Sequence, residues 1–167
     1  MLAFILVMIG VLSRVIAHAP NFTPVIALAL FGGMMLEKRQ ALWMPLALMV
    51  ISDMVIGLHQ VIFFTWGSML LISLLGYWQR ENRSGLTVLG MSMMSAVVFF
   101  FVTNFGSWLA MYPHTVEGLI QCFVAGIPFF RNIFVSTLAY SAVLFGMHEL
   151  VRMRVKDSRL AWIVSGI

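Results

Sequence analysis

Charged residues are scarce in this chain. Lysine, arginine, aspartate and glutamate make up only 10% of its 167 residues, whereas 62% are hydrophobic. Soluble domains carry roughly 25% charged residues, so the composition argues against a soluble fold. With a mean hydropathy of +1.01, we expect an integral membrane protein, long enough for about six helices of roughly 20 residues each.

Cysteine and catalytic motifs are also scarce. Cys122 is the single cysteine, so an internal disulfide is excluded. The sequence has no His-Glu-x-x-His motif, no Walker phosphate loop and no pair of intramembrane carboxylates. His18, His59 and His114 could join Cys122 as metal ligands, but they lack any characteristic spacing. We therefore expect no metal, no cofactor and no enzymatic activity.

Six apolar segments are present instead, separated by short polar ones. They cover about 2–17, 25–36, 41–58, 61–78, 86–111 and 132–151, and a basic tail follows at 152–167. Pro20 and Pro24 end the first segment, because proline cannot continue a helix and restricts the residue before it. The sequence predicts an all-α integral membrane protein, a compact bundle of six transmembrane helices.

The connection from Tyr112 to Arg131 is unusual because most of it is apolar. It is too short to span on its own, so we expect it to lie at the membrane interface or to fold over the mouth of the bundle. A seventh span is the alternative interpretation. With seven spans, the basic C-terminal tail would lie on the outer side of the membrane, against the retention of basic residues in the cytoplasm.

The positions of the basic residues predict the orientation. Of the ten Lys and Arg residues, all but Arg14 and Arg131 fall in the even-numbered loops or the tail. Because basic residues are retained in the cytoplasm, both termini are expected there. The positive net charge thus reflects topology and not nucleic-acid binding. The first segment lacks a basic n-region and is read as a retained span.

Polar side chains gather toward the predicted outer face. Arg14 and Asp53 lie in the outer halves of two spans, where a charge is costly unless it has a partner or a wet cavity. The inner halves carry few polar groups, which indicates a cup open to the outside. We expect the ligand-binding residues to be Arg14, Asp53, Asn104, Arg131 and Asn132, with His18, Asn21 and His59 at the rim.

Several of these residues have structural alternatives. Arg14 could extend to the headgroups, and Asp53 could pair with Arg14 or Arg131 only to hold helices together. Asn104 could act with Thr103 as a hydrogen-bonding clamp between helices. Tryptophans near the segment ends, such as Trp66, are typical of an aromatic belt.

Several motifs carry a family resemblance. They are Pro20-Asn21-Phe22-Thr23-Pro24-Val25, Phe31-Gly32-Gly33, Ser52-Asp53, Thr103-Asn104-Phe105-Gly106 and Ile127-Pro128-Phe129-Phe130-Arg131-Asn132. Together they resemble an uncharacterised family of small bacterial membrane proteins. That family is similar in size and hydropathy to the substrate-binding S components of energy-coupling-factor vitamin transporters.

The resemblance implies an inner-membrane subunit that captures a small vitamin, cofactor precursor or related metabolite from outside. It also implies a coupling subunit and ATPases as partners. S components typically carry Ala-x-x-x-Ala on the first helix, whereas this chain has only Ser13 and Ala17 there, so solitary action stays open. The alternative function is a non-transporting accessory subunit of a larger membrane complex.

Overall fold

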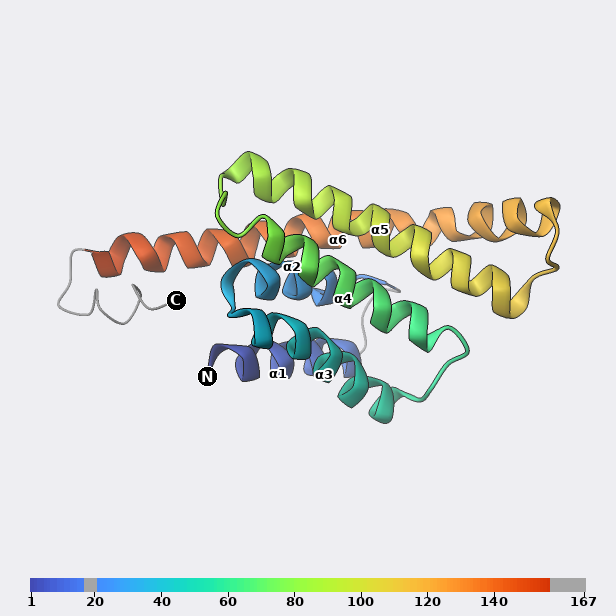
Figure 1. The fold of residues 1–167 in the computed structure, drawn as a ribbon, viewed down its shortest axis with the longest axis horizontal. Coiled ribbons are helices and arrows are strands. Elements are labelled where there is room, and N and C mark those ends of the chain that lie inside the picture. Colours follow the sequence, from blue (N-terminus) through green and yellow to red (C-terminus); the bar gives the residue numbers. More distant parts are fainter. Residues whose placement is uncertain (17–20, 157–167) are drawn as a thin grey trace.

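The computed structural model describes residues 1–16 and 21–156, which fold as an all-α protein (Figure 1). The helices in these ranges are α1 (Leu2–Val15), α2 (Val25–Met35), α3 (Lys38–Ile56), α4 (Ile62–Trp78), α5 (Gly85–Met111) and α6 (Val116–Lys156). The first five coincide with apolar segments of the sequence to within three residues at each end. The prediction of an all-α protein is confirmed.

Three of the described helices are long and apolar enough to cross a membrane, namely α3, α5 and α6. The other three are apolar but shorter, with 14, 11 and 17 residues in α1, α2 and α4. At about 1.5 Å per residue, α2 reaches roughly 16 Å, about half of a hydrocarbon core. The long apolar helices indicate a membrane-associated protein.

The sequence predicts that the sixth apolar segment starts at about 132, whereas the helix that contains it starts earlier. Helix α6 begins at Val116 and continues through Pro128 for 41 residues. Its first turn is capped by Thr115, whose hydroxyl accepts a hydrogen bond of 3.1 Å from the Gly118 N–H. The apolar stretch becomes helical because it packs along the C-terminal half of α5, where the Phe123 and Phe100 rings lie 5.7 Å apart.

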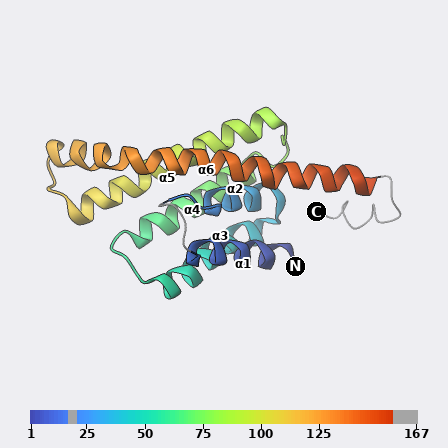
Figure 2. The same ribbon diagram turned by 180° about the vertical axis from the view of Figure 1, so that it is seen from behind.

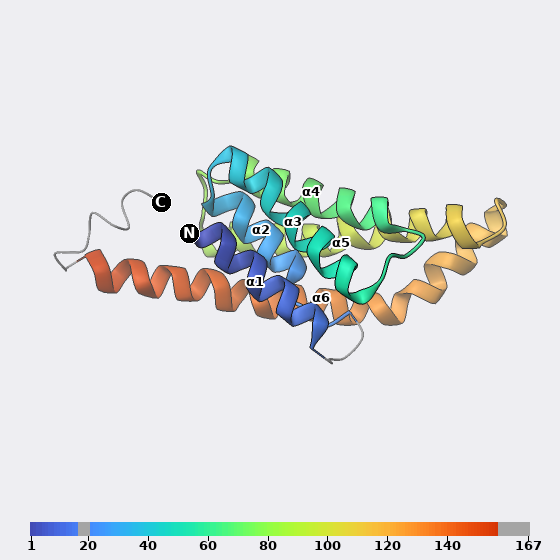
Figure 3. The ribbon, with the colours of Figure 1, turned by 90° about the horizontal axis from the view of Figure 1, so that it is seen from below.

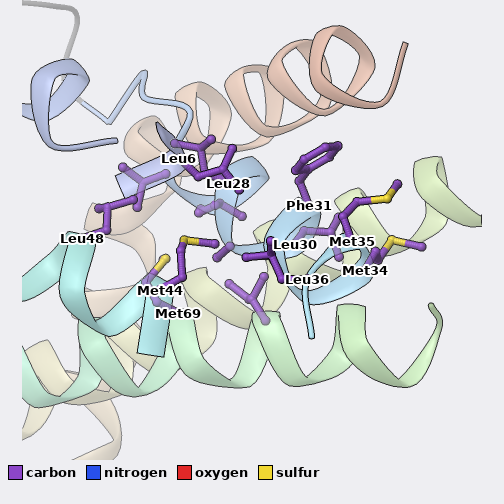
Figure 4. Packing of buried hydrophobic residues seen from close by; sticks show 14 of the residues in the cluster. Leu6, Leu28, Leu30, Phe31, Met34, Met35, Leu36, Met44, Leu48 and Met69 are labelled. Atoms are coloured by element: carbon purple, nitrogen blue, oxygen red, sulfur yellow. The ribbon is translucent and has the colours of Figure 1, made fainter. Parts of the chain in front are cut away.

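Helix α2 forms the centre of the molecule. All 11 of its residues are buried, as expected of a helix that is apolar on every face. Its Leu28 and Leu30 belong to one cluster with Met44 and Leu48 of α3 and with Met69 of α4 (Figure 4). The short length and complete burial of α2 make it a hub around which the longer helices pack.

Glycine allows α2 and α4 to approach within backbone contact. A Cβ added to Gly33 would lie 2.1 Å from the carbonyl oxygen of Ser73, and one added to Gly76 would lie 2.6 Å from that of Leu30. Small residues at helix crossings are typical of membrane bundles, because association there depends on close packing. The α2–α4 crossing therefore has no room for larger side chains.

The connections gather at two ends of the bundle. The N-terminus, the α2–α3 turn, the α4–α5 loop and the C-terminal part of α6 lie at one end (Figures 1 and 3). This basic end carries Lys38, Arg39, Arg80, Arg83 and Arg152. The α3–α4 and α5–α6 turns lie at the opposite end, called the cavity end below. Helix α6 runs past the other helices at the basic end, and together with α5 it extends past α1 to α4 at the cavity end (Figure 2).

Candidate functional site

An ion pair joins the last turns of α1 and α3 at the cavity end. Nη2 of Arg14 lies 2.7 Å from Oδ1 of Asp53, and Nη1 donates a hydrogen bond of 2.5 Å to the Ser52 hydroxyl. Asp53 is 0% exposed, so it depends on these neighbours to offset its charge. Of the two partners expected for Asp53, the structure selects Arg14, whereas Arg131 is exposed on α6.

A tryptophan completes the surroundings of Asp53. Nε1 of Trp66 on α4 donates a hydrogen bond of 2.7 Å to Oδ2 of Asp53. Oδ1 thus lies in ion-pair contact with Arg14 of α1, and Oδ2 accepts the hydrogen bond from α4. The interpretation of Trp66 as a member of an aromatic belt missed this contact. Asp53 and Trp66 lie at nearly equal distances along the chain from the middle of the α3–α4 connection, and such positions face each other in a helical hairpin.

Gly57 ends α3 one turn after Asp53. Its N–H bonds to the Asp53 carbonyl at 2.9 Å, and its φ of 113° is one that glycine adopts readily. The chain then turns through His59 into α4. This glycine therefore fixes both the end of the helix that carries Asp53 and the direction of the connection beyond it.

A cavity of about 360 Å³ opens beside the ion pair. Its polar wall contains Arg14, Asn21, Thr23, His59, Thr65 and Ser136. Its apolar wall contains Val25, Ile26, Met49, Ile56, Met69, Phe99 and Ile133. Since every helix from α1 to α6 or its adjoining connection contributes, the cavity depends on the complete bundle. Asp53 does not line it and lies behind Arg14.

The segment before α2 borders the cavity in a constrained conformation. Asn21 has a φ of 58°, a left-handed value that asparagine tolerates better than most residues. Its carbonyl accepts a hydrogen bond of 3.5 Å from Ser136 of α6, and the neighbouring Phe22 ring lies 5.9 Å from the Tyr140 ring. The segment is thereby held against α6, with Asn21 and Thr23 facing the cavity.

The structure brings together three of the predicted site residues at the cavity, namely Arg14, Asn21 and His59, with Asp53 directly behind. Asn104 lies elsewhere, between α5 and α6. Its Nδ2 donates to the Phe100 carbonyl at 2.7 Å, and a Cβ added to Gly126 would lie 2.3 Å from its Oδ1. Asn104 thus bonds within α5, as does Thr103 through its hydroxyl to the Phe99 carbonyl, and Asn104 packs against Gly126 of α6.

The remaining predicted residues are dispersed. Arg131 is exposed and Asn132 is half-buried, and neither is among the cavity-lining residues. His18 falls outside the residues that the structure describes. Sequence reasoning missed Ser52, Thr65 and Ser136, because single hydroxyl residues are common in apolar helices and carry no distinctive spacing.

The residues considered as metal ligands lie apart where they are described. His59 lines the cavity, the His114 ring contacts the Leu109 carbonyl at 3.0 Å, and the Cys122 thiol donates to the Asn104 carbonyl at 3.3 Å. Within residues 1–16 and 21–154, no group of three His, Cys, Asp or Glu side chains could hold a metal ion.

Comparison with known proteins places the chain in a family. Neither the curated proteins nor the solved structures contain a match. A family model does match, over residues 1–159, and it therefore covers all of the described helices. The chain belongs to the family of unknown function DUF6580.

Proposed function

We propose that this protein captures a small metabolite at the outer face of the bacterial inner membrane, as the substrate-binding subunit of an uptake system. The observation that carries the proposal is the cavity of about 360 Å³ beside the Arg14–Asp53 pair. Small-molecule sites are mostly apolar concavities with a few convergent polar groups, and this cavity has that composition.

The proposed topology places six helices in the bilayer, with both termini in the cytoplasm. The basic end would then face the cytoplasm, in accordance with the retention of Lys and Arg on that side. The cavity end would face outward, where a captured molecule arrives. Helix α2 would reach only part of the way, which is acceptable because protein surrounds it and not lipid.

The wall of the cavity indicates the chemistry of the ligand. Arg14 is the charged side chain of the wall, and the carboxylate of Asp53 behind it offsets that charge. We therefore expect an uncharged or zwitterionic molecule. Hydroxyl and amide groups of Thr23, Thr65 and Asn21 would bind its polar part, and the apolar wall would hold the rest. Vitamins and cofactor precursors have this mixed character.

The likeness to S components leads to a proposal about partners. A coupling subunit with ATPases would use the cytoplasmic basic end, while the cavity end stays free for the ligand. Solitary action is the alternative within this proposal, because Ser13 stands where S components typically carry alanine.

An accessory subunit of a larger complex is the second candidate function. It is favoured by the arm that α5 and α6 form beyond the other helices at the cavity end (Figure 1). Phe101, Phe105, Val124 and Ile127 of this arm are 45–58% exposed, and a neighbouring membrane subunit could cover them.

Two matched threonines provide the test. Each hydroxyl bonds to a carbonyl of its own helix, but Thr65 lines the cavity whereas Thr103 on α5 does not. The purified protein is screened for a retained molecule by native mass spectrometry, and for stabilisation by a panel of vitamins and cofactor precursors. Thr65→Val should weaken binding of the molecule so found by roughly 10-fold or more, because it removes a hydrogen-bonding partner.

Thr103→Val is the control and should leave the affinity unchanged. Equal losses in both variants would show that helix stability and not cavity chemistry controls binding. If the wild type retains no molecule and no compound of the panel raises its melting temperature, the accessory function replaces the uptake function.

A further inference from the structure

A second polar cluster lies at the basic end of the bundle, opposite the cavity end. Arg83 in the α4–α5 loop donates from Nε to the Arg80 carbonyl at 2.7 Å. Its Nη1 contacts the sulfur of Met35, the last residue of α2, at 3.2 Å. The loop is therefore held over the end of α2, with the Arg83 guanidinium fixed beside it.

Helix α6 brings further side chains to the same place. The His148 ring lies 6.1 Å from the ring of Phe31, and Phe31 is one turn before Met35 on α2. Arg152 follows His148 by one turn of α6, and it pairs with Glu149 at 3.2 Å. Arg80, Arg83 and Arg152 thus gather around the end of α2.

The cluster has an excess of positive charge. Three guanidinium groups outnumber two carboxylates, Glu81 of the same loop and Glu149 of α6, and in the described part of the chain neither Arg80 nor Arg83 pairs with a carboxylate. Partial burial, together with the positive charges of Arg80 and Arg152, lowers the pKa of Arg83. Like charges held together are unfavourable unless an anion neutralises them.

The surroundings of the cluster are those of a membrane interface. Trp78 at the end of α4 and Leu86 at the start of α5 are 80% and 81% exposed. On α6, Met147 and Leu150 are also exposed. Tryptophan is enriched at the level of the lipid headgroups, and the apolar side chains provide contact surface for acyl chains.

We propose that Arg80, Arg83 and Arg152 bind the phosphate of an anionic phospholipid headgroup. Arginine suits this role because its planar guanidinium donates two parallel hydrogen bonds to phosphate oxygens. The fixed loop presents Arg83, and Arg80 lies over the Tyr77 ring at 4.9 Å. A lipid satisfies the cationic cluster and the neighbouring apolar surface together. A soluble phosphate or an acidic protein would leave that apolar surface uncovered.

The test follows the melting temperature of the full-length protein in uncharged detergent. Phosphatidylglycerol should raise it more than phosphatidylcholine does, and inorganic phosphate at the same concentration should have little effect. In R80Q/R83Q the apparent affinity for phosphatidylglycerol should fall by roughly tenfold, the factor expected from about 1.4 kcal/mol of lost charge-assisted hydrogen bonding.

The matched control is K38Q/R39Q, which removes two exposed cations from the same end at the α2–α3 turn. Exposed charges outside the site contribute little, so its affinity should stay within about threefold of the wild type. Equal losses of affinity in both variants would show that the lipid responds to general surface charge and not to this cluster, and would overturn the proposal. Stabilisation by inorganic phosphate alone, or displacement of the lipid by a polyglutamate peptide, would assign the cluster to a different ligand and also overturn it.

Folding is checked without lipid. R80Q/R83Q removes the mutual repulsion together with the Arg83 contacts to Arg80 and Met35, and these effects oppose each other, so its lipid-free melting temperature should stay close to that of the wild type. A clearly lower value would show that the arginines serve the fold, against the proposal. The result does not depend on whether the cavity binds a metabolite.

Discussion

The helices around α2 and the pair formed by α5 and α6 have similar apolar compositions but different surroundings. In the first region, α2 is buried along its whole length and Asp53 is 0% exposed. In the second, large apolar residues such as Phe101, Leu109 and Val143 are 40–55% exposed. In the first region α2 and Asp53 are enclosed by protein, and exposed apolar residues such as Phe4 and Phe63 lie on the outer faces of α1 and α4. Among the described residues, the second region has no helix that is buried along its length in the way α2 is.

The two ion pairs show the same difference. Arg14 and Asp53 have side-chain exposures of 17% and 1%, whereas those of Arg152 and Glu149 are 59% and 51%. A buried charge depends on its partner because water cannot replace it, and an exposed charge does not. Substitutions should therefore destabilise the enclosed region strongly and the α5–α6 region weakly.

The largest effect is expected from Asp53→Asn. This change leaves the charge of Arg14 without its partner, and breaking a buried pair costs about 3–5 kcal/mol. The double variant Arg14→Gln/Asp53→Asn should lose less unfolding free energy than the two single variants lose together, because no isolated charge remains. The free energy of unfolding in detergent, measured for all four proteins, gives the coupling.

Arg131→Gln serves as the control for that cycle. Arg131 is exposed on α6, so its effect should add to that of Asp53→Asn without coupling. Strict additivity in the Arg14 cycle would contradict the buried pair. It would mean that Asp53 interacts with water or ligand on its own.

A smaller effect is expected from Gly33→Ala. The added Cβ meets the Ser73 backbone at 2.1 Å, and overpacking of this kind costs about 1–3 kcal/mol. Gly146 on α6 has open space around it, so Gly146→Ala should stabilise the helix by about 0.5–1 kcal/mol. Thermal unfolding of both variants makes the comparison. If Gly33→Ala and Gly146→Ala destabilise the protein equally, the backbones of α2 and α4 are farther apart at Gly33 than in this structure.

Sequence reasoning found most of the helices because their boundaries are local. Pro24 precedes α2, and charged turns separate α2 from α3 and α4 from α5, so hydropathy alone places these elements. It missed the start of α6, because Pro128 and the short length of the apolar stretch are typical of a connection. Packing against α5 overrides that local signal, and packing partners cannot be read from hydropathy.

The candidate site was only partly predictable for a related reason. Arg14 and Asp53 were identifiable because charges in apolar helices are rare and expensive. Asn104 was assigned to the same site by its depth in the span, but depth does not give rotation about the helix axis, and its side chain lies toward Gly126 of α6. Trp66 was missed for the same reason.

The smallest effect is expected from Glu149→Gln. Its pair with Arg152 is exposed and spans one turn of α6, and such pairs contribute about 0–1 kcal/mol. The unfolding free energy in uncharged detergent should therefore change far less than for Asp53→Asn, although both changes remove one carboxylate from an arginine. A loss as large as that of Asp53→Asn would mean that α6 is enclosed at the basic end by contacts like those around α2. The contrast between the two regions would then fail.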